Sequence, residues 1–197
     1  MMSPRPVLQE LSPLPPHKQI TDDALVIQVR QNPARFVELY QLYQQRIYTY
    51  HLSRTCNPNE AEELTSQTFL AALENLDHYN EKRSFGGWLF GIAQHKRADF
   101  YRKLYRELPL EKAENEPAPD PSPEEQAVSH LDMAAVARGL QQLPANQVEA
   151  LSLRIFGGLS TAQVGKLMGK SEAAVKMLVL RGLRNLQQKL VRNLEVL

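Results

Sequence analysis

Apolar positions along most of the chain recur every three or four residues, which is the spacing of one face of an α-helix. Between residues 36 and 51 they are Phe36, Leu39, Tyr40, Tyr43, Ile47, Tyr50 and His51. The same period marks residues 60–76 and 85–104. No segment of useful length alternates apolar and polar residues as a strand would. The pattern therefore predicts an all-α protein.

Proline divides this helical pattern into two blocks. Prolines crowd residues 1–20 and recur between residues 109 and 123, and a helix cannot propagate through such segments. We expect a disordered tail over residues 1–20 and a flexible acidic linker over residues 108–124. The two predicted helical domains then span residues 21–107 and 125–192.

Local signals place the ends of the first helices. Thr21 or Asp22 is expected to cap the first helix, which Asn32-Pro33 ends. After a break at residues 57–59, Asn59 is expected to cap the helix over residues 60–76. A polar loop follows, and it leads into the most unusual segment of the chain.

Residues 84–103 combine large aromatic side chains with closely spaced cations. One broad helical arc is predicted to face the core: Phe85, Trp88, Leu89, Ile92, Ala93, Phe100 and Leu104. The opposite arc is predicted to face outward: Phe90, Gln94, Arg97, Tyr101 and Tyr105. Exposed rings among cations suit bases that stack and phosphates that need neutralising. A protein-binding face, or rings covered by other helices, remains the alternative.

The C-terminal block predicts a helix-turn-helix after a supporting helix that follows Pro144. Ser160 is expected to cap a short helix, Gly169 to supply the positive φ of a tight turn, and Ser171 to cap a second helix. The second helix would enter the major groove with small residues near its start. The alternative is a generic helical hairpin with a solvated basic face.

Charge is unevenly distributed, although the net charge is only +1. Residues 84–106 carry +4 and residues 152–192 carry +7, whereas residues 107–132 carry −7. Two basic blocks therefore flank an acidic one, which favours contact with nucleic acid at both.

Several functional classes find no support in the residues. Cys56 is the single cysteine, and the five histidines lack metal-ligand spacing, so neither a disulfide framework nor a metal site is predicted. No glycine-rich phosphate loop is present, and we expect no cofactor and no catalytic activity. The N-terminus lacks the apolar run of a signal peptide, and no apolar run reaches the length of a membrane span. A cytoplasmic protein is expected.

Three stretches together resemble the extracytoplasmic-function (ECF) sigma factors, which belong to the sigma-70 family and direct bacterial RNA polymerase. They are AEELTSQTFLAALENLDHYN, SFGGWLFGIAQHKRADFYRK and LPANQVEALSLRIFGGLSTAQVGKLMGKSEAAVKMLVLRGLRNL. The resemblance covers about residues 22–190. It implies an N-terminal region 2 domain that binds core polymerase and melts the −10 element. It also implies a C-terminal region 4 domain that reads the −35 element, and an anti-sigma partner.

The resemblance also implies roles for individual residues. Residues 60–76 would dock on the β′ coiled coil of core polymerase through Glu63, Leu64, Gln67 and Phe69. The −10 element would be bound and melted by Tyr79, Asn80, Lys82, Arg83, Ser84, Trp88, His95, Lys96, Arg97, Tyr101 and Arg102. The −35 element would be bound by Arg154, Thr161, Ser171, Ala173, Lys176, Met177, Leu180, Arg181 and Arg184.

Some positions depart from the family pattern. Ser66-Gln67 stands where the docking helix often carries Gln followed by an acid, and Leu178 and Leu183 replace arginines that many members carry. Two other functions remain open. A sigma-mimicking protein that sequesters an anti-sigma factor would need no DNA-binding face, and a plain helix-turn-helix repressor would leave residues 60–105 unexplained.

Overall fold

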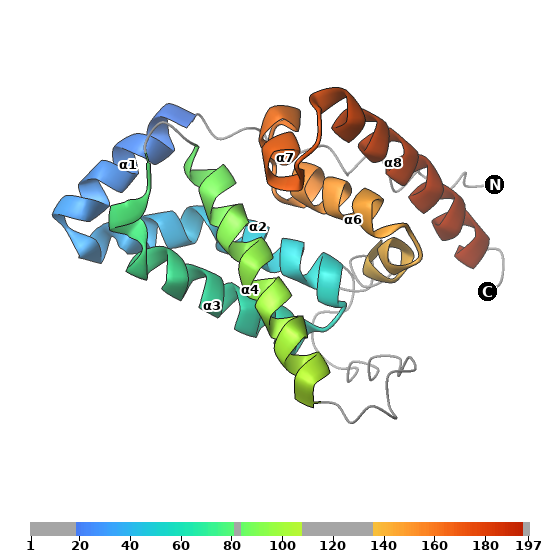
Figure 1. Cartoon of the computed structure of the whole chain (residues 1–197), viewed down its shortest axis with the longest axis horizontal. Helices are drawn as coiled ribbons and strands as arrows, with labels where there is room; N and C mark the ends of the chain where they lie inside the picture. Colours follow the sequence, from blue (N-terminus) through green and yellow to red (C-terminus); the bar gives the residue numbers. More distant parts are fainter. Residues whose placement is uncertain (1–18, 81–83, 108–135, 195–197) are drawn as a thin grey trace, which may run out of the picture.

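The computed structural model describes residues 19–80, 84–107 and 136–194, and the helices in these ranges form two groups (Figure 1). The N-terminal group contains α1 (Gln19–Gln31), η2 (Pro33–Arg35), α2 (Phe36–Thr55), α3 (Pro58–Glu74), η3 (Leu76–His78) and α4 (Phe85–Glu107). The C-terminal group contains a helical segment at residues 136–141, then α6 (Ala145–Leu151), η5 (Ser152–Phe156), α7 (Thr161–Met168) and α8 (Glu172–Leu194). No strand occurs in the described ranges, so the predicted all-α class is confirmed.

The N-terminal group is built around α2. This helix packs along α3, and α4 lies across both, while α1 covers the first turns of α2. Its buried residues recur at the predicted period, with Leu39, Tyr43, Ile47 and Tyr50 inside. The repeating apolar stripe in the sequence therefore corresponds to the real core of this domain.

The C-terminal group packs α6 and α7 against α8. Val148, Leu151 and Leu186 form its own small core together with Val136 and Leu140 from the preceding helical segment. This core is small, and the C-terminal group makes further apolar contacts outside it.

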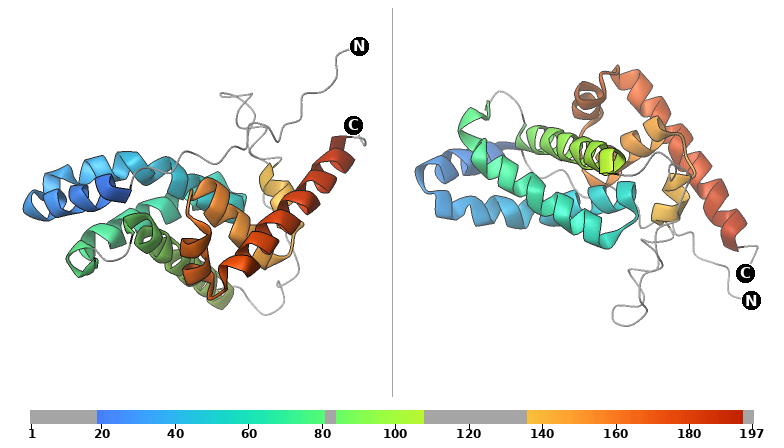
Figure 2. Two further views of the ribbon diagram at one scale, coloured as in Figure 1. Left: turned by 90° about the horizontal axis from the view of Figure 1, so that it is seen from above. Right: turned by 60° about the horizontal axis from the view of Figure 1, so that its bottom comes forward.

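Those further contacts come from the N-terminal domain. Leu153, Leu159, Val164 and Val175 are buried in the same cluster as the core of α2 and α4. Figure 2 shows α7 beside α4 and the C-terminal group seated against the N-terminal one, in agreement with the α2–η5 and α4–α7 contacts. The two domains are therefore docked on each other in this structure.

The segment η5 has an unusual geometry that serves this docking. It is a single π-helical turn, in which backbone hydrogen bonds span five residues instead of four. The turn directs Ser152 and Leu153 toward the N-terminal domain, while Ile155 and Phe156 pack into the C-terminal core. One turn of helix thus contributes to two cores.

The helix ends differ from prediction in two places. Asn57, rather than Asn59, caps α3: its side chain accepts hydrogen bonds from the backbone N–H groups of Asn59 and Glu60. Pro58 at the first helical position makes Asn57 the residue with extended backbone. Asp22 lies inside the first turn of α1 instead of ahead of it, and its carboxylate accepts a 2.5 Å hydrogen bond from the Tyr43 hydroxyl.

The predicted acidic linker, at residues 108–124, lies outside the described residues, as does most of the predicted tail. α1 already begins at Gln19, within the range predicted as tail.

Candidate nucleic-acid interface

The helix-turn-helix is formed by α7 and α8, as the turn and cap residues predicted. Ser160 and Gln163 form a reciprocal capping box at the start of α7. Gly169 ends α7 with a φ of 62°, and the Ser171 hydroxyl accepts a hydrogen bond from the Ala174 N–H at the start of α8. These caps fix the angle between the two helices, and the predicted capping roles of Ser160, Gly169 and Ser171 are confirmed.

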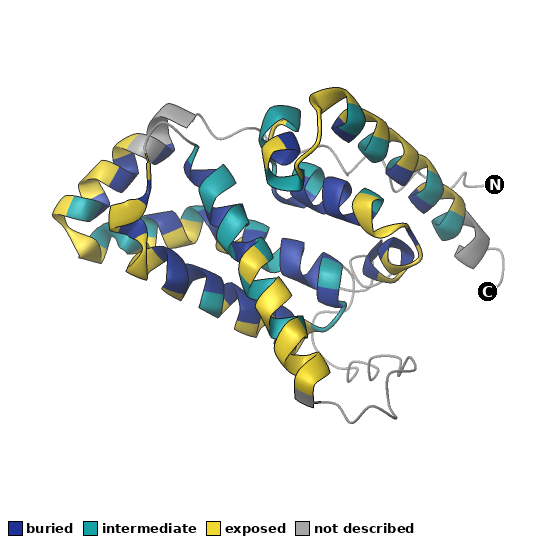
Figure 3. Cartoon of the chain, viewed as in Figure 1, coloured by how far each residue is buried: buried dark blue, intermediate teal, exposed yellow. Residues whose placement is uncertain are grey.

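One face of α8 is left open to solvent over its first half (Figure 3). Lys176, Met177, Leu180 and Arg181 recur at helical spacing on this face, and all are exposed. Met177 and Leu180 keep 46% and 53% of their surface although they are apolar. Exposed apolar side chains between two cations give a surface that can contact both thymine methyl groups and phosphates.

The other residues predicted to bind the −35 element are divided. Ser171, Ala173 and Arg184 are exposed near the same face. Arg154 is half-buried and donates a hydrogen bond of 3.1 Å to the Leu159 carbonyl oxygen, and the Thr161 hydroxyl bonds Glu172 at 3.2 Å. These last two side chains support the local fold in this arrangement, whatever else they contact.

The segment from Tyr79 onward, which the resemblance assigns to the −10 element, begins in an aromatic cluster. Tyr79 packs against Trp88 and Phe85, with ring centroids 5.2 and 5.7 Å away, and only 3% of its surface is exposed. In this conformation the Tyr79 ring is therefore closed to an incoming base, and its role at the −10 element stays a prediction. The physical reason is that three large rings bury more apolar surface together than any ring could alone.

The remaining −10 residues show mixed exposure. Asn80, His95 and Arg102 are exposed, and Lys96 is half-buried. Lys82 and Arg83 lie outside the described residues.

The outward arc predicted on α4 is largely covered, which is the main correction to the sequence analysis. Phe90 is fully buried and packs edge-on against Tyr50 at 5.4 Å. Gln94 and Tyr101 are half-buried, and the Arg97 side chain keeps only 15% of its surface. Tyr105 alone of the five is well exposed, at 69%. Helical periodicity grouped these residues correctly, but Tyr50 of α2 covers Phe90, and Glu149 of the C-terminal domain binds Gln94 and Arg97.

The core-facing arc on α4 is confirmed for most of its members. Phe85, Leu89 and Ala93 are buried, and Trp88, Ile92 and Phe100 are half-buried. Leu104 is exposed, since the last turns of α4 extend beyond the neighbouring helices (Figure 3).

A buried carboxylate lies at the centre of the docked interface. Glu149 on α6 accepts hydrogen bonds from the Tyr50 hydroxyl and Gln94 Nε2 at 2.8 Å and from Arg97 at 2.9 Å. Arg54 Nε lies 3.4 Å from the same carboxylate. All four partners belong to the N-terminal domain, so one acidic side chain is held entirely by groups of the other domain.

The electrostatics of this cluster keep Glu149 ionised. Burial alone would raise the pKa of its carboxyl, but Arg97 and Arg54 outweigh that effect, and the pKa lies below its ordinary value. Burial and the neighbouring Arg97 lower the pKa of Arg54. Two guanidinium groups facing one carboxylate leave an excess of positive charge on the N-terminal side.

Two further polar contacts join the domains around this carboxylate. The Oγ atoms of Ser53 and Ser152 lie 2.8 Å apart, and both serines are buried. Arg46 stacks over the ring of Tyr43 and donates a hydrogen bond to the Gly157 carbonyl oxygen.

Ser84, predicted to bind the −10 element, is also engaged across the interface. Its hydroxyl accepts hydrogen bonds from the Gln163 side chain on α7 and from the Gly87 N–H. The start of α4 is therefore tied to the start of α7.

The predicted polymerase-binding helix, α3, places its four candidate residues on two different faces. Glu63 is exposed and Gln67 half-buried, and Gln67 donates a 2.9 Å hydrogen bond to Glu63. Leu64 and Phe69 are buried in the domain core, so the prediction that they face a partner is wrong. Their helical period brings them under α2, whereas Leu70, one turn after Gln67, keeps 58% of its surface.

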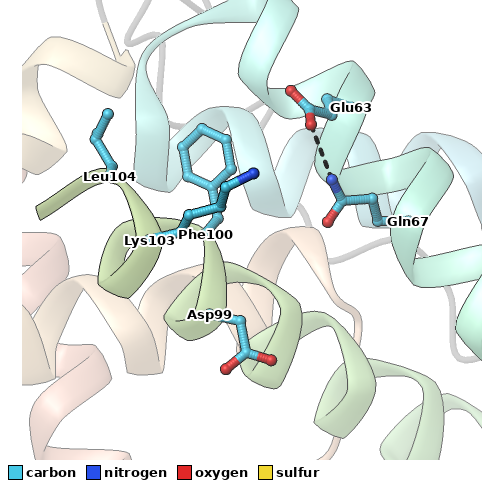
Figure 4. A pocket seen from close by; sticks show the side chains of 6 residues that line it. All are labelled: Glu63, Gln67, Asp99, Phe100, Lys103 and Leu104. Atoms are coloured by element: carbon cyan, nitrogen blue, oxygen red, sulfur yellow. Dashed lines mark hydrogen bonds between the residues drawn. The ribbon is translucent and has the colours of Figure 1, made fainter. Parts of the chain in front are cut away.

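Glu63 and Gln67 border a pocket between α3 and α4 (Figure 4). Its volume is about 250 Å³, and it is lined by Glu63, Gln67, Asp99, Phe100, Lys103 and Leu104. Two apolar side chains with charged residues around them make a surface that suits a protein partner better than a small molecule.

Other classes of site find no support in the described ranges. No cluster of three or more metal-ligating side chains occurs there, and no helix in that part of the chain is long and apolar enough to cross a membrane. Cys56 is half-buried, and burial raises its pKa to about 11. Its thiolate is therefore scarce at neutral pH.

The sequence analysis missed the residues that join the domains, chiefly Glu149, Arg54 and Arg46. A signal for Glu149 is present, because it lies directly between Val148 and Ala150 in an apolar run. A lone acid among core residues indicates a buried carboxylate, which needs cationic or hydrogen-bonding partners.

Comparison with known proteins identifies both groups of helices. The sigma-70 region 2 model matches residues 39–107, and the sigma-70 region 4 model matches residues 133–186. The fold is similar to that of a chain in the solved complex of the sigma factor RpoE with the anti-sigma factor NepR from Bartonella quintana. The similarity covers 79% of this chain and 96% of that chain. The TM-score is 0.66 at 22% identity.

Two relatives carry the sequence match further. The ECF RNA polymerase sigma factor BldN of Streptomyces coelicolor is 35% identical over 158 residues, covering 79% of this chain and 60% of the relative. The ECF RNA polymerase sigma factor ShbA of Streptomyces griseus is 33% identical over 132 residues, covering 64% of this chain and 69% of the relative. With both sigma regions matched in order and relatives of this similarity, the chain belongs to the ECF sigma factors of the sigma-70 family.

Proposed function

We propose that this chain is an alternative sigma factor that binds core RNA polymerase and directs it to promoters carrying particular −10 and −35 elements. The open face of α8 carries the proposal: Lys176, Met177, Leu180 and Arg181 are exposed together on the second helix of a capped helix-turn-helix. In this arrangement a side chain of each chemical type can reach a base edge or a phosphate. The chain itself performs no chemical step in this proposal.

The polymerase contact is assigned to the exposed face of α3. Glu63, Gln67 and Leu70 follow one another at intervals of one turn, beside the pocket lined by Phe100 and Leu104. A helix face with an apolar centre and polar edges suits docking against another helix, and the β′ coiled coil of polymerase would supply one.

The −10 element is assigned to the start and the cationic length of α4. Asn80, His95 and Arg102 are accessible now, and Trp88 and Tyr79 form a cluster on which unstacked bases could lie after a local rearrangement. Unstacking a base costs a few kcal/mol, and stacking on an aromatic ring returns about 1–3 kcal/mol. An anti-sigma factor that binds this chain is proposed as its regulator, since the structurally similar RpoE is bound by one.

The test is reconstituted transcription with purified core polymerase, this chain and a library of promoter fragments. We expect transcripts from a subset of promoters that core polymerase alone does not use. If the chain neither binds core polymerase nor changes promoter use, the sigma-factor proposal fails. Binding to an anti-sigma factor without transcription would favour the sigma-mimicking function instead, and promoter binding without polymerase would favour a repressor.

A further inference from the structure

The cluster around Glu149 has the composition of an anion-binding site. Arg54, Arg97, Gln94 and Tyr50 all direct donor groups at one carboxylate, and all four come from α2 and α4. Without Glu149, two guanidinium groups would lie close together with no anion between them. Such a site attracts a phosphate oxygen by the same hydrogen bonds that now hold the carboxylate.

Glu149, whose carboxylate fills this site, belongs to the C-terminal domain. In the proposed function that domain binds the −35 element, whereas α4 binds the −10 element. The family resemblance implies that Arg97 on α4 binds the −10 element, yet only 15% of its side chain is exposed and its guanidinium donates a hydrogen bond to Glu149 of the C-terminal domain. A nucleic-acid strand and α6 cannot occupy this part of α4 at the same time. In the docked arrangement, this part of α4 therefore cannot bind the −10 element as the proposed function requires.

We propose that the docked arrangement is an autoinhibited closed form, in which Glu149 occupies a phosphate-binding site formed by Tyr50, Arg54, Gln94 and Arg97. Promoter DNA takes this site when the C-terminal domain leaves it. The inference rests on the proposed function for the identity of the anion, but the closed form itself can be measured without polymerase. DNA binding at α4 and domain docking exclude each other.

Two features make the closed form specific yet able to open. The Ser53–Ser152 contact and the Arg46–Gly157 hydrogen bond fix one register between the domains. Residues 108–135 separate the two described domains in sequence, and a segment of that length can span about 90 Å when extended. The covalent connection therefore permits docking without enforcing it.

The first experiment removes the charge of Glu149 and keeps its size. In the full-length chain, Glu149→Gln is expected to increase the radius of gyration measured by small-angle X-ray scattering. It should also tighten binding to a fluorescent oligo(dT) strand by about tenfold, since an unmatched buried cation favours opening. Glu38→Gln, which breaks the half-exposed pair with Arg35 inside the N-terminal domain, is the matched control and should change neither quantity.

The second experiment locks the domains together. Ser53 and Ser152 are changed to cysteine in a Cys56→Ser background, and oxidised glutathione closes the disulfide, because the two side chains already meet. Oxidation is expected to lower oligo(dT) binding and promoter-dependent transcription at least tenfold, and reduction should restore both. Equal DNA binding by the oxidised and reduced chains would overturn the proposal, as would an unchanged radius of gyration for Glu149→Gln.

The outcomes separate this proposal from the proposed function. If the Cys56→Ser chain that keeps Ser53 and Ser152 neither binds core polymerase nor gives promoter-dependent transcription, the sigma-factor function fails. The scattering result would still decide whether Glu149 holds the domains closed. If transcription is normal and the locked chain is as active as the reduced one, the sigma-factor function stands and autoinhibition is refuted.

Discussion

The guanidinium of Arg30 on α1 donates a hydrogen bond of 2.5 Å to the backbone carbonyl oxygen of Tyr79. The same side chain also donates to the carbonyl oxygens of Leu76 and Asp77 at 3.0 and 3.3 Å. One cation thus binds three carbonyl groups where η3 ends and the segment predicted to bind the −10 element begins. Arg30 is therefore a positioning residue for that segment, although it lies almost fifty residues earlier in the chain.

Replacing Arg30 by methionine should uncouple strand opening from initial DNA binding. Loss of hydrogen bonds from a charged donor is expected to destabilise the η3 region by about 2 kcal/mol, because the three carbonyl oxygens lose that donor. Permanganate reactivity of promoter thymines should then fall more than duplex binding by the holoenzyme. Arg35→Met is the control, since its side chain contacts Glu38 and Gln28 instead. Equal effects of both substitutions would refute a special role for Arg30.

Leu70→Asp should weaken binding to core polymerase. Leu70 is exposed on the face of α3 that carries Glu63 and Gln67, so a charge there removes apolar contact without disturbing the core. We expect a loss of about 2 kcal/mol in binding, measured by fluorescence anisotropy with labelled core enzyme. Ile27→Asp, at a comparably exposed apolar position on α1, should leave the affinity unchanged. A similar loss in both variants would indicate a nonspecific effect of charge.

Lys176→Ala should weaken recognition of the upstream promoter element by about 1–3 kcal/mol if the contact is to a base. Its exposed position next to Met177 on α8 makes either a base or a phosphate contact sterically possible. Binding of the holoenzyme to matched and scrambled −35 sequences distinguishes a base contact from a phosphate contact. A loss confined to the matched sequence supports base readout, whereas an equal loss on both sequences means that the contact is to a phosphate.

Stability should fall with acidification because of His51. This histidine is buried, bonded to the Thr68 hydroxyl at 3.1 Å, and burial, with Arg97 nearby, lowers its pKa to about 3. The unfolded chain takes up the proton near pH 6.5 but the folded chain does not, so stability is complete above that pH. It declines by about 1.4 kcal/mol per pH unit down to about 3.

Urea denaturation between pH 7 and 5 tests this expectation, because that window spans the ordinary pKa of histidine and lies above the ordinary pKa of Glu149, which its arginine partners lower further. His51→Gln should remove most of the slope, while the same change at exposed His95 should retain it. A slope that persists unchanged in His51→Gln would assign the pH dependence to another group.

Gly158→Ala should loosen the domain interface. Gly158 has a φ of 61°, and a Cβ there would lie 2.9 Å from an Arg46 nitrogen, which would displace Arg46 from the neighbouring carbonyl oxygen. Gly169→Ala is a matched control, since its φ is 62° but no atom lies within 4 Å of the added carbon. Both changes incur a backbone cost of about 1–2 kcal/mol. Only Gly158→Ala should also increase the radius of gyration.

Local sequence patterns were sufficient for the fold and for the helix-turn-helix. The spacing of Leu39, Tyr43 and Ile47 gave the core face of α2, and Ser160 and Gly169 marked the ends of α7. These features depend on contacts within one helix or one turn, so the residues that make them lie close together in the sequence. Family resemblance then supplied the functional expectation that composition alone could not.

The arrangement of the domains was beyond such patterns. Phe90 is buried against Tyr50 of α2, and Arg97 binds Glu149 of α6, and nothing local indicates either contact. The partner residue Glu149 lies 52 residues beyond Arg97. An exposed binding face and an interface between domains have the same periodicity and composition, because both combine aromatic rings with cations.

The π-helical turn at Ser152–Phe156 makes the chain sensitive to length at this one place. Its extra residue per turn rotates everything downstream by about 100° relative to an ordinary α-helix. If one residue were deleted there, Phe156 could stay in the core of the C-terminal domain only if Leu153 turned away from the N-terminal domain. Homologous chains should therefore tolerate substitutions in this turn far better than insertions or deletions.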